Sequence, residues 1–291
     1  MIITMFRRIY CNTTKNILRS KSFWLFLLVY LALVISEYTE VFEWYHVNSE
    51  TMEQIFYRDP RFIFDYQSYV KEFCDAFAIF LKYASPLLAV VTTASIVAGD
   101  YNDHFFEIEK AGGINTRKYV LARIAAITVI NCVVVTIFSA LWYHLTITAK
   151  GVEGMTLFEI LAGSTYRLLL NSLLRVVPCV LFHVCLTYAV GTFVKHSATT
   201  SAICMAYVIA NYVYDARFNV ADKGIYVRYL IPTDPRKLMD YLYYFDSEWF
   251  EWMIETFDTS LGDALLALSV MLGSAVIFCT AAYLRTRKRS L

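Results

Sequence analysis

The residues with the most evident chemistry lie between positions 99 and 118, where acidic, aromatic and basic side chains separate two long apolar runs. Asp100 and Asp103 are of a type that caps the first turn of a helix, and Gly112 and Gly113 are residues that end one. The apolar side chains between these positions fall on one side of a helix, so the segment predicts a short surface helix with one apolar face. An ordinary solvated turn is the alternative interpretation.

Basic residues follow this predicted short helix. Asn115 can cap the next helix, and Arg117, Lys118 and Arg123 occur where lipid phosphates or a cytoplasmic partner could neutralise their charge. The alternative is that these side chains are ordinary basic anchors beside a membrane, which would bind nothing in particular.

A second group of polar residues recurs every four positions where an apolar run begins. Arg167, Asn171 and Arg175 therefore share one face of a predicted helix. These side chains either extend their polar ends to the membrane surface or line a path for an anionic or polar substrate. Asn211, in the following apolar run, presents a choice between lining such a path and making an interhelical hydrogen bond, and we favour the hydrogen bond.

No set of residues predicts a catalytic or metal centre. The chain contains no G-x-x-x-x-G-K-[ST] loop for ATP phosphates, no C-x-x-C pair and no H-E-x-x-H sequence. An intramembrane serine protease would need a serine between two glycines, and Ser164 has a glycine on one side only. His183 is predicted to be a packed, hydrogen-bonded helix residue and not a base. We therefore expect no enzyme activity, metal or cofactor in this chain.

The composition predicts that helices in a membrane position these residues, because 58% of the 291 residues are hydrophobic and only 18% are charged. A soluble domain with so few charges would expose a large apolar surface to water. The net charge of +1 argues against nucleic acid as a partner, since phosphate binding requires concentrated basic charge. Six apolar runs approach the roughly 20 residues that a membrane-crossing helix needs. They cover Phe23–Ser36, Phe77–Ala98, Tyr119–Tyr143, Leu170–Phe193, Ser197–Tyr214 and Leu261–Leu284.

The distribution of charge predicts the orientation of these spans. Basic residues gather in segments 1–21, 99–118 and 285–291, whereas acidic residues dominate segments 37–76 and 215–260. Six spans place both termini on one side, and the excess of Lys and Arg places that side in the cytoplasm. We expect one all-α transmembrane domain in the cell membrane, with a basic amphipathic N-terminal segment and a first span that is retained and not cleaved as a signal. An amphipathic stripe within the last acidic segment is expected on the outer membrane surface.

This arrangement resembles the permease subunits of type-2 ABC exporters, whose six spans have both ends in the cytoplasm. In that family a basic amphipathic N-terminal helix, similar to Phe6–Lys21 here, leads into the first span. The second span ends in an acidic short helix, and a basic-Tyr-x-x-x-basic sequence opens the third. The matching residues are Asp100, Tyr101, Glu107, Arg117, Lys118, Tyr119 and Arg123. One departure is Gly112-Gly113, where many relatives place a proline.

The resemblance implies that the short helix is a coupling helix that docks on a separate cytoplasmic ATPase subunit. Its contact residues would be Asn102, Phe105, Phe106, Glu107, Ile108, Glu109 and Lys110. ATP and Mg²⁺ would bind to that ATPase, and a second permease chain, identical or related, would complete a bacterial transporter. Aromatic, largely uncharged spans favour a peptide, a drug-like amphiphile or a lipid as the exported substrate. A non-transporting membrane sensor or an assembly scaffold is the alternative.

Overall fold

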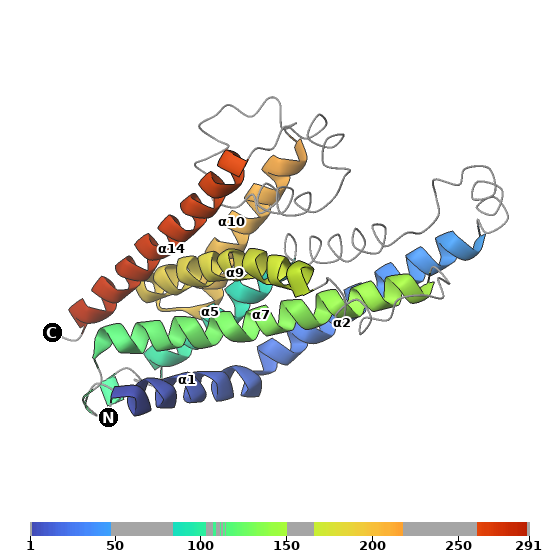
Figure 1. The fold of residues 1–291 in the computed structure, drawn as a ribbon. Helices are drawn as coiled ribbons and strands as arrows, with labels where there is room; N and C mark the ends of the chain where they lie inside the picture. Colours follow the sequence, from blue (N-terminus) through green and yellow to red (C-terminus); the bar gives the residue numbers. More distant parts are fainter. Residues whose placement is uncertain are drawn as a thin grey trace.

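The computed structural model describes residues 2–47, 84–102, 107–108, 111, 113, 115–149, 166–217 and 261–289. Every long regular element in this part of the chain is a helix (Figure 1). The helices are α1 (Ile2–Arg19), α2 (Lys21–Val47), α5 (Ser85–Asn102), α7 (Thr116–Ala149), α9 (Tyr166–Val194), α10 (Ser197–Arg217) and α14 (Leu261–Arg289). The predicted all-α fold is therefore confirmed for the described residues.

Three of these helices contain stretches that are long and apolar enough to cross a membrane. The stretches are Thr116–Leu141 in α7, Val176–Val194 in α9 and Leu268–Lys288 in α14. α1 and the first part of α2 form a bent pair with an angle of 60°, which would make a fourth span if the pair crosses together. In α10 the apolar stretch Ser197–Ala210 is shorter. The helices are compatible with a membrane protein, and six spans remain a prediction.

The helix ends differ from the predicted apolar runs mainly at their polar flanks. α2 continues through Val47, so the predicted outer segment 37–76 begins inside this helix. Residues 37–47 contain no glycine or proline that would stop a helix. Most of both predicted outer segments, including the amphipathic stripe of the second, falls in 48–83 and 218–260, which lie outside the described residues.

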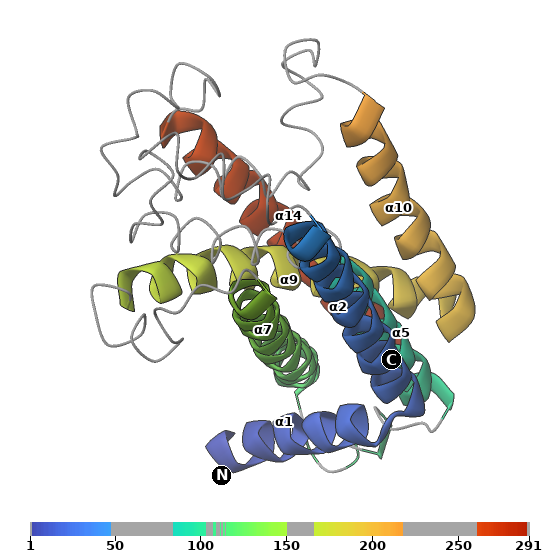
Figure 2. The ribbon, with the colours of Figure 1, turned by 90° about the vertical axis from the view of Figure 1, so that its right-hand side faces the viewer.

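α9 lies in the middle of the bundle, because α5, α7, α10 and α14 all pack against it (Figures 1 and 2). Its contact with α5 is close at Gly191, where an added Cβ atom would lie only 2.8 Å from Cγ1 of Val97. α14 packs chiefly along α9 and leaves its other face uncovered by described residues, with Val276 and Ile277 exposed. In a membrane, lipid or a second protein chain would cover that face.

α1 is amphipathic and packs beside the first part of α7 (Figures 1 and 2). Ile9, Thr13 and Ile17 follow one another at steps of four and are buried, which places them on the face toward the bundle. Arg7 and Lys15 are exposed on the remaining surface. This division of buried and exposed residues agrees with the amphipathic segment that the sequence predicts at the N-terminus.

Candidate functional site: a buried polar cluster between α1, α5 and α7

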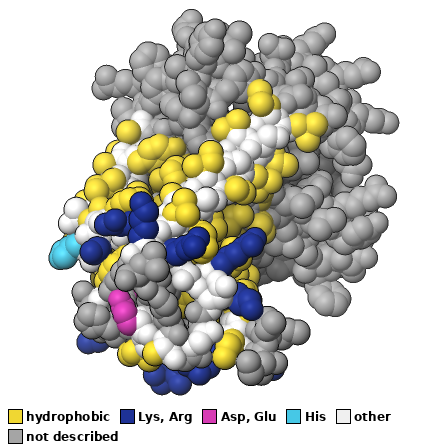
Figure 3. All heavy atoms as spheres, turned by 90° about the vertical axis from the view of Figure 1, so that its left-hand side faces the viewer, with side chains coloured by type: hydrophobic (Ala, Val, Ile, Leu, Met, Phe, Trp, Pro, Cys, Tyr) yellow, Lys and Arg dark blue, Asp and Glu magenta, His cyan; other side chains and the backbone are white. Residues whose placement is uncertain are grey.

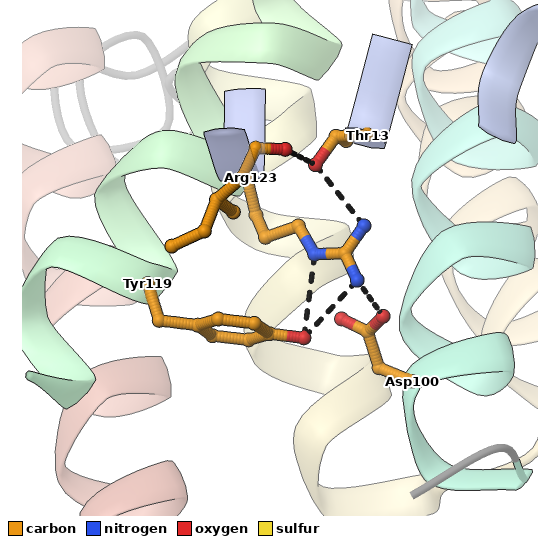
Figure 4. A network of polar contacts seen from close by, with 5 residues as sticks. Thr13, Asp100, Tyr119 and Arg123 are labelled. Carbon is orange, nitrogen blue, oxygen red and sulfur yellow. Dashed lines mark hydrogen bonds and ion pairs between the residues drawn. The ribbon is translucent and has the colours of Figure 1, made fainter. Parts of the chain in front are cut away.

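Arg123 is the largest fully buried side chain in the described part of the chain. It lies two turns into α7 and forms an ion pair with Asp100, which lies in the last turn of α5 and is only 8% exposed (Figure 4). A buried charge is costly unless a partner and hydrogen bonds compensate it. The pair therefore fixes the end of α5 against the beginning of α7.

The rest of the Arg123 guanidinium is bound by two hydroxyl groups (Figure 4). Its Nη1 donates to Oγ1 of Thr13 in α1 at 3.0 Å, while its Nη2 and Nε donate to the hydroxyl of Tyr119 at 3.1 and 3.3 Å. The Thr13 hydroxyl in turn donates to the backbone carbonyl of Ile9 at 2.7 Å. One arginine thus connects three helices that are far apart in the sequence, and each contact satisfies a polar group that burial would otherwise leave without water.

A second polar contact between α5 and α7 lies deeper in the bundle. The Nδ2 atom of Asn131 donates to Oγ1 of Thr92 at 3.0 Å, and also to the carbonyl of Ile127 at 2.8 Å. Asn131 is eight residues after Arg123, and Thr92 is eight residues before Asp100. The two helices are antiparallel and rise 1.5 Å per residue, so the Arg123–Asp100 contact and the Asn131–Thr92 contact are ~12 Å apart on each helix. One relative position of the two helices therefore allows both contacts.

The end of α5 is also attached to α9. The hydroxyl of Tyr101 donates to the backbone carbonyl of Thr192 at 2.8 Å. The ammonium group of Lys195 lies 5.8 Å from the centre of the Tyr101 ring, a distance at which a cation is attracted to the ring face. The last turn of α5 therefore contacts α7 through Arg123, which also binds Thr13 of α1. It contacts α9 through Tyr101.

The structure corrects two of the sequence-based roles near this cluster. Asp100 does not cap the start of a helix, because α5 continues through Asn102 and the Asp100 carboxylate is paired with Arg123. Arg123 does not face lipid phosphates or a partner, because it is fully buried and Asp100 supplies its counter-charge. Asn115 does cap α7 as predicted, since its Oδ1 accepts from the backbone N–H of Arg117 at 2.9 Å.

The predicted coupling residues lie between the two helix ends that Asp100 and Arg123 join. Of these residues, Glu107 is half-buried and Ile108 is 61% exposed. Asn102 is the last residue of α5, and its side chain is not among those described. Four further predicted contacts lie outside the described residues, namely Phe105, Phe106, Glu109 and Lys110. The structure therefore describes the helix ends on either side of the predicted interface and two of its residues. Its contact with another protein stays a prediction.

The predicted substrate path is placed only through its backbone. Arg167, Asn171 and Arg175 lie in the first turns of α9, where a spacing of four puts them on one face of the helix. Asn211 lies in the second half of α10. The side chains of all four residues are outside the described part of the structure, so their path-lining role stays a prediction.

His183 is a packed helix residue, as the sequence predicts. It is 3% exposed, its Nδ1 lies 2.8 Å from the backbone carbonyl of Cys179, and the Phe182 ring packs against it edge to face. Ser164 lies outside the described residues. Among the residues that the structure does describe, no three His, Cys, Asp or Glu side chains come together as metal ligands would.

The cluster holds helices together. Its two charged groups, Asp100 and Arg123, are buried and paired with each other. Sequence reasoning singled out Asp100 and Arg123 for other roles and missed Thr13, Thr92 and Asn131 entirely. The sequence did contain a signal for the last two. Thr92 and Asp100 are eight residues apart, as are Arg123 and Asn131, and two antiparallel helices bring such equally spaced pairs into contact. The sequence matches none of the protein-family models and none of the curated proteins with which it was compared.

Proposed function

We propose that this chain is the permease subunit of an ATP-binding cassette exporter, which moves a peptide, a drug-like amphiphile or a lipid outward. The energy comes from ATP hydrolysed with Mg²⁺ on separate cytoplasmic ATPase subunits. The chain crosses the membrane six times with both termini in the cytoplasm, and it pairs with a second permease chain. Arg167, Asn171, Arg175 and Asn211 are the candidate residues along the substrate path.

The ion pair between Asp100 and Arg123 is the observation that carries this proposal. The segment between α5 and α7 is the one that the family resemblance assigns to the ATPase contact, and the pair joins the two helix ends on either side of it. If the two helix ends were not joined, a force on the segment between them would change the conformation of that segment and would not move the helices. With its ends joined, the segment and the adjoining turns of α5 and α7 move together.

Further contacts of Arg123 and of the last turn of α5 extend this unit to other helices. Arg123 bonds Thr13 of α1, and Tyr101 bonds the end of α9. A displacement at the ATPase contact therefore reaches the amphipathic N-terminal helix and the central helix of the bundle. ATP can drive transport through such a unit only if the ATPase binds its two positions with different affinity.

The exposed side chain of Ile108 gives the proposed contact an apolar anchor. Apolar anchors at the centre of an interface commonly contribute about 2 kcal/mol or more, whereas exposed charge pairs at its rim contribute about 0–1 kcal/mol. We therefore expect Ile108→Ala and Phe106→Ala to weaken ATPase association strongly. Glu109→Gln is the matched control at the same segment and should change association little.

The test is co-purification of the full chain with the ATPase encoded by a neighbouring reading frame, followed by measurement of ATPase association and of substrate-stimulated hydrolysis. An effect of about 2 kcal/mol corresponds to roughly a thirtyfold loss of affinity for the alanine variants. If the chain purifies without any ATPase, or if both alanine variants keep the parental association and transport, the sensor or scaffold alternative is favoured.

A further inference from the structure

One end of the helical bundle carries most of the basic side chains that the structure describes. Figure 3 shows these side chains gathered across the end of the molecule, next to a broad apolar surface. They come from the surface of α1, the start of α2, the start of α7, the residue that follows α9 and the end of α14. The described members are Arg7, Arg8, Lys15, Arg19, Lys21, Arg117, Lys118, Lys195, Arg285, Arg287 and Lys288. The described acids at this end are Asp100, which is paired with Arg123, and Glu107.

Lys195 combines an unusual backbone conformation with a cation–π contact at this end. It directly follows α9 with a φ of +63°, a left-handed conformation that normally favours glycine. Its N–H donates to the carbonyl of Gly191 at 2.8 Å, and its ammonium group lies against the Tyr101 ring.

Arg285 of α14 is held in a similar way beside the end of α9. Its guanidinium carbon lies 5.3 Å from the centre of the Phe193 ring, two residues before Lys195. Neither Arg285 nor Lys195 forms an ion pair with an acid among the described residues. Two cations are thus held over aromatic rings on adjacent helix ends and keep their charge available for an external anion.

The basic group borders directly on exposed apolar side chains. Phe193 is 56% exposed and Leu284 is 49% exposed, and farther along α14 the side chains of Val276 and Ile277 are about two-thirds exposed, at 65% and 66%. The stretch of α14 that is long and apolar enough to cross a membrane is Leu268–Lys288, and its last turn carries the basic residues Arg285, Arg287 and Lys288. A ligand that fits both surfaces has an anionic head and long apolar chains.

From this juxtaposition we infer that Lys195 and Arg285 bind the headgroup of an anionic phospholipid whose acyl chains lie along α14. The phosphate is attracted by the two cations that the aromatic rings hold in place, and the chains cover the exposed face of α14. A soluble acidic protein would satisfy the cations and would leave that apolar face uncovered. The inference requires contact with a membrane and is independent of an ATPase partner.

The test uses the full chain in a neutral detergent and follows its thermal unfolding while phosphatidylglycerol is added. A ligand that binds only the folded state stabilises it by RT ln(1 + [L]/Kd), so the unfolding temperature rises with ligand concentration and reports the affinity. Phosphatidylglycerol should raise this temperature, whereas phosphatidylcholine and inorganic phosphate at equal concentration should not. The two controls separate a lipid headgroup site from an attraction to lipid in general and from a site for free phosphate.

Two matched double variants locate the site. Lys195→Gly with Arg285→Gln removes both held cations, and glycine suits the backbone at position 195, so the fold is retained. Its apparent affinity for phosphatidylglycerol should fall about thirtyfold, which corresponds to about 1 kcal/mol for each basic side chain near an anionic lipid surface. Lys15→Gln with Lys118→Gln removes the same charge from the same end of the molecule and should keep the parental affinity.

Three results would overturn the inference. Equal losses in the two double variants would show a diffuse attraction to the basic end of the molecule. An equal effect of phosphatidylcholine would show that the headgroup charge is irrelevant, and an equal effect of inorganic phosphate would show a site for the free anion. None of these measurements includes an ATPase, so their failure is distinguishable from failure of the proposed transport function.

Discussion

Removal of one partner of the buried ion pair is the most demanding test of the structure. Arg123→Met keeps an unbranched side chain of similar reach but removes the positive charge, so the Asp100 carboxylate stays buried without its ion-pair partner. Breaking a buried pair in this way typically costs about 3–5 kcal/mol, because the remaining charge is uncompensated. The Thr13 hydroxyl also loses a charged donor at 3.0 Å, so we expect a loss near the upper end of that range.

The double variant Arg123→Met with Asp100→Leu separates the contribution of the ion pair to the free energy of unfolding from the cost of an unpaired buried charge. With both charges gone, neither helix buries a group that needs a counter-ion, so the double variant should be more stable than Arg123→Met alone. Strong coupling between two neighbouring substitutions is the expected outcome when they belong to one interaction. Asn131→Leu is the matched control two turns deeper in α7. It breaks a neutral interhelical bond to Thr92 and a neutral bond to the Ile127 carbonyl within α7. A neutral interhelical bond typically contributes about 0.6 kcal/mol in membrane proteins, and about 1.7 kcal/mol is near the maximum.

The free energy of unfolding of the full chain can be measured in mixed micelles by titration with a denaturing detergent. Arg123→Met should lower it several times more than Asn131→Leu, and addition of Asp100→Leu should restore part of the loss. Limited proteolysis of α1 provides a second measurement, because Thr13 is the α1 residue that Arg123 holds. The reasoning is refuted if Arg123→Met costs no more than Asn131→Leu, or if the effects of the two charge substitutions simply add.

Two further predictions concern helix packing and orientation. Gly191→Ala places a Cβ atom 2.8 Å from Cγ1 of Val97, so it should lower the free energy of unfolding by about 1–3 kcal/mol, as overpacking does. Addition of Val97→Ala should relieve the clash. A double variant that is no more stable than Gly191→Ala would contradict this cause. Cys11 of α1 is exposed, so in a chain whose other cysteines are replaced by alanine it should react with a membrane-impermeant thiol reagent in opened cells but not in intact ones. Labelling in intact cells would place the N-terminus outside and reverse the proposed orientation.

The sequence by itself determined the helical elements and several local details. Long apolar runs predict helices, and α7, α9, α10 and α14 each contain most or all of one such run. In α9 the helix continues through Pro178. Asn115 was identifiable as a cap because capping depends on the residues that immediately follow it. His183 was identifiable as a packed residue because a histidine inside an apolar helix can bond the carbonyl four residues before it. These features depend on neighbours within about one helical turn.

Only the tertiary structure decided the role of Arg123. In the sequence it is a basic residue near the start of an apolar run. A solvent-facing anchor and a buried ion-pair partner would both occur at such a position, so the sequence pattern does not distinguish them. Its burial is favourable only because Asp100, 23 residues away, and Thr13, 110 residues away, meet it across helix contacts. Local periodicity gives each helix a face but does not give the rotation and register of two helices against each other. Those follow from packing of whole helix surfaces, as the close approach of Gly191 to Val97 illustrates.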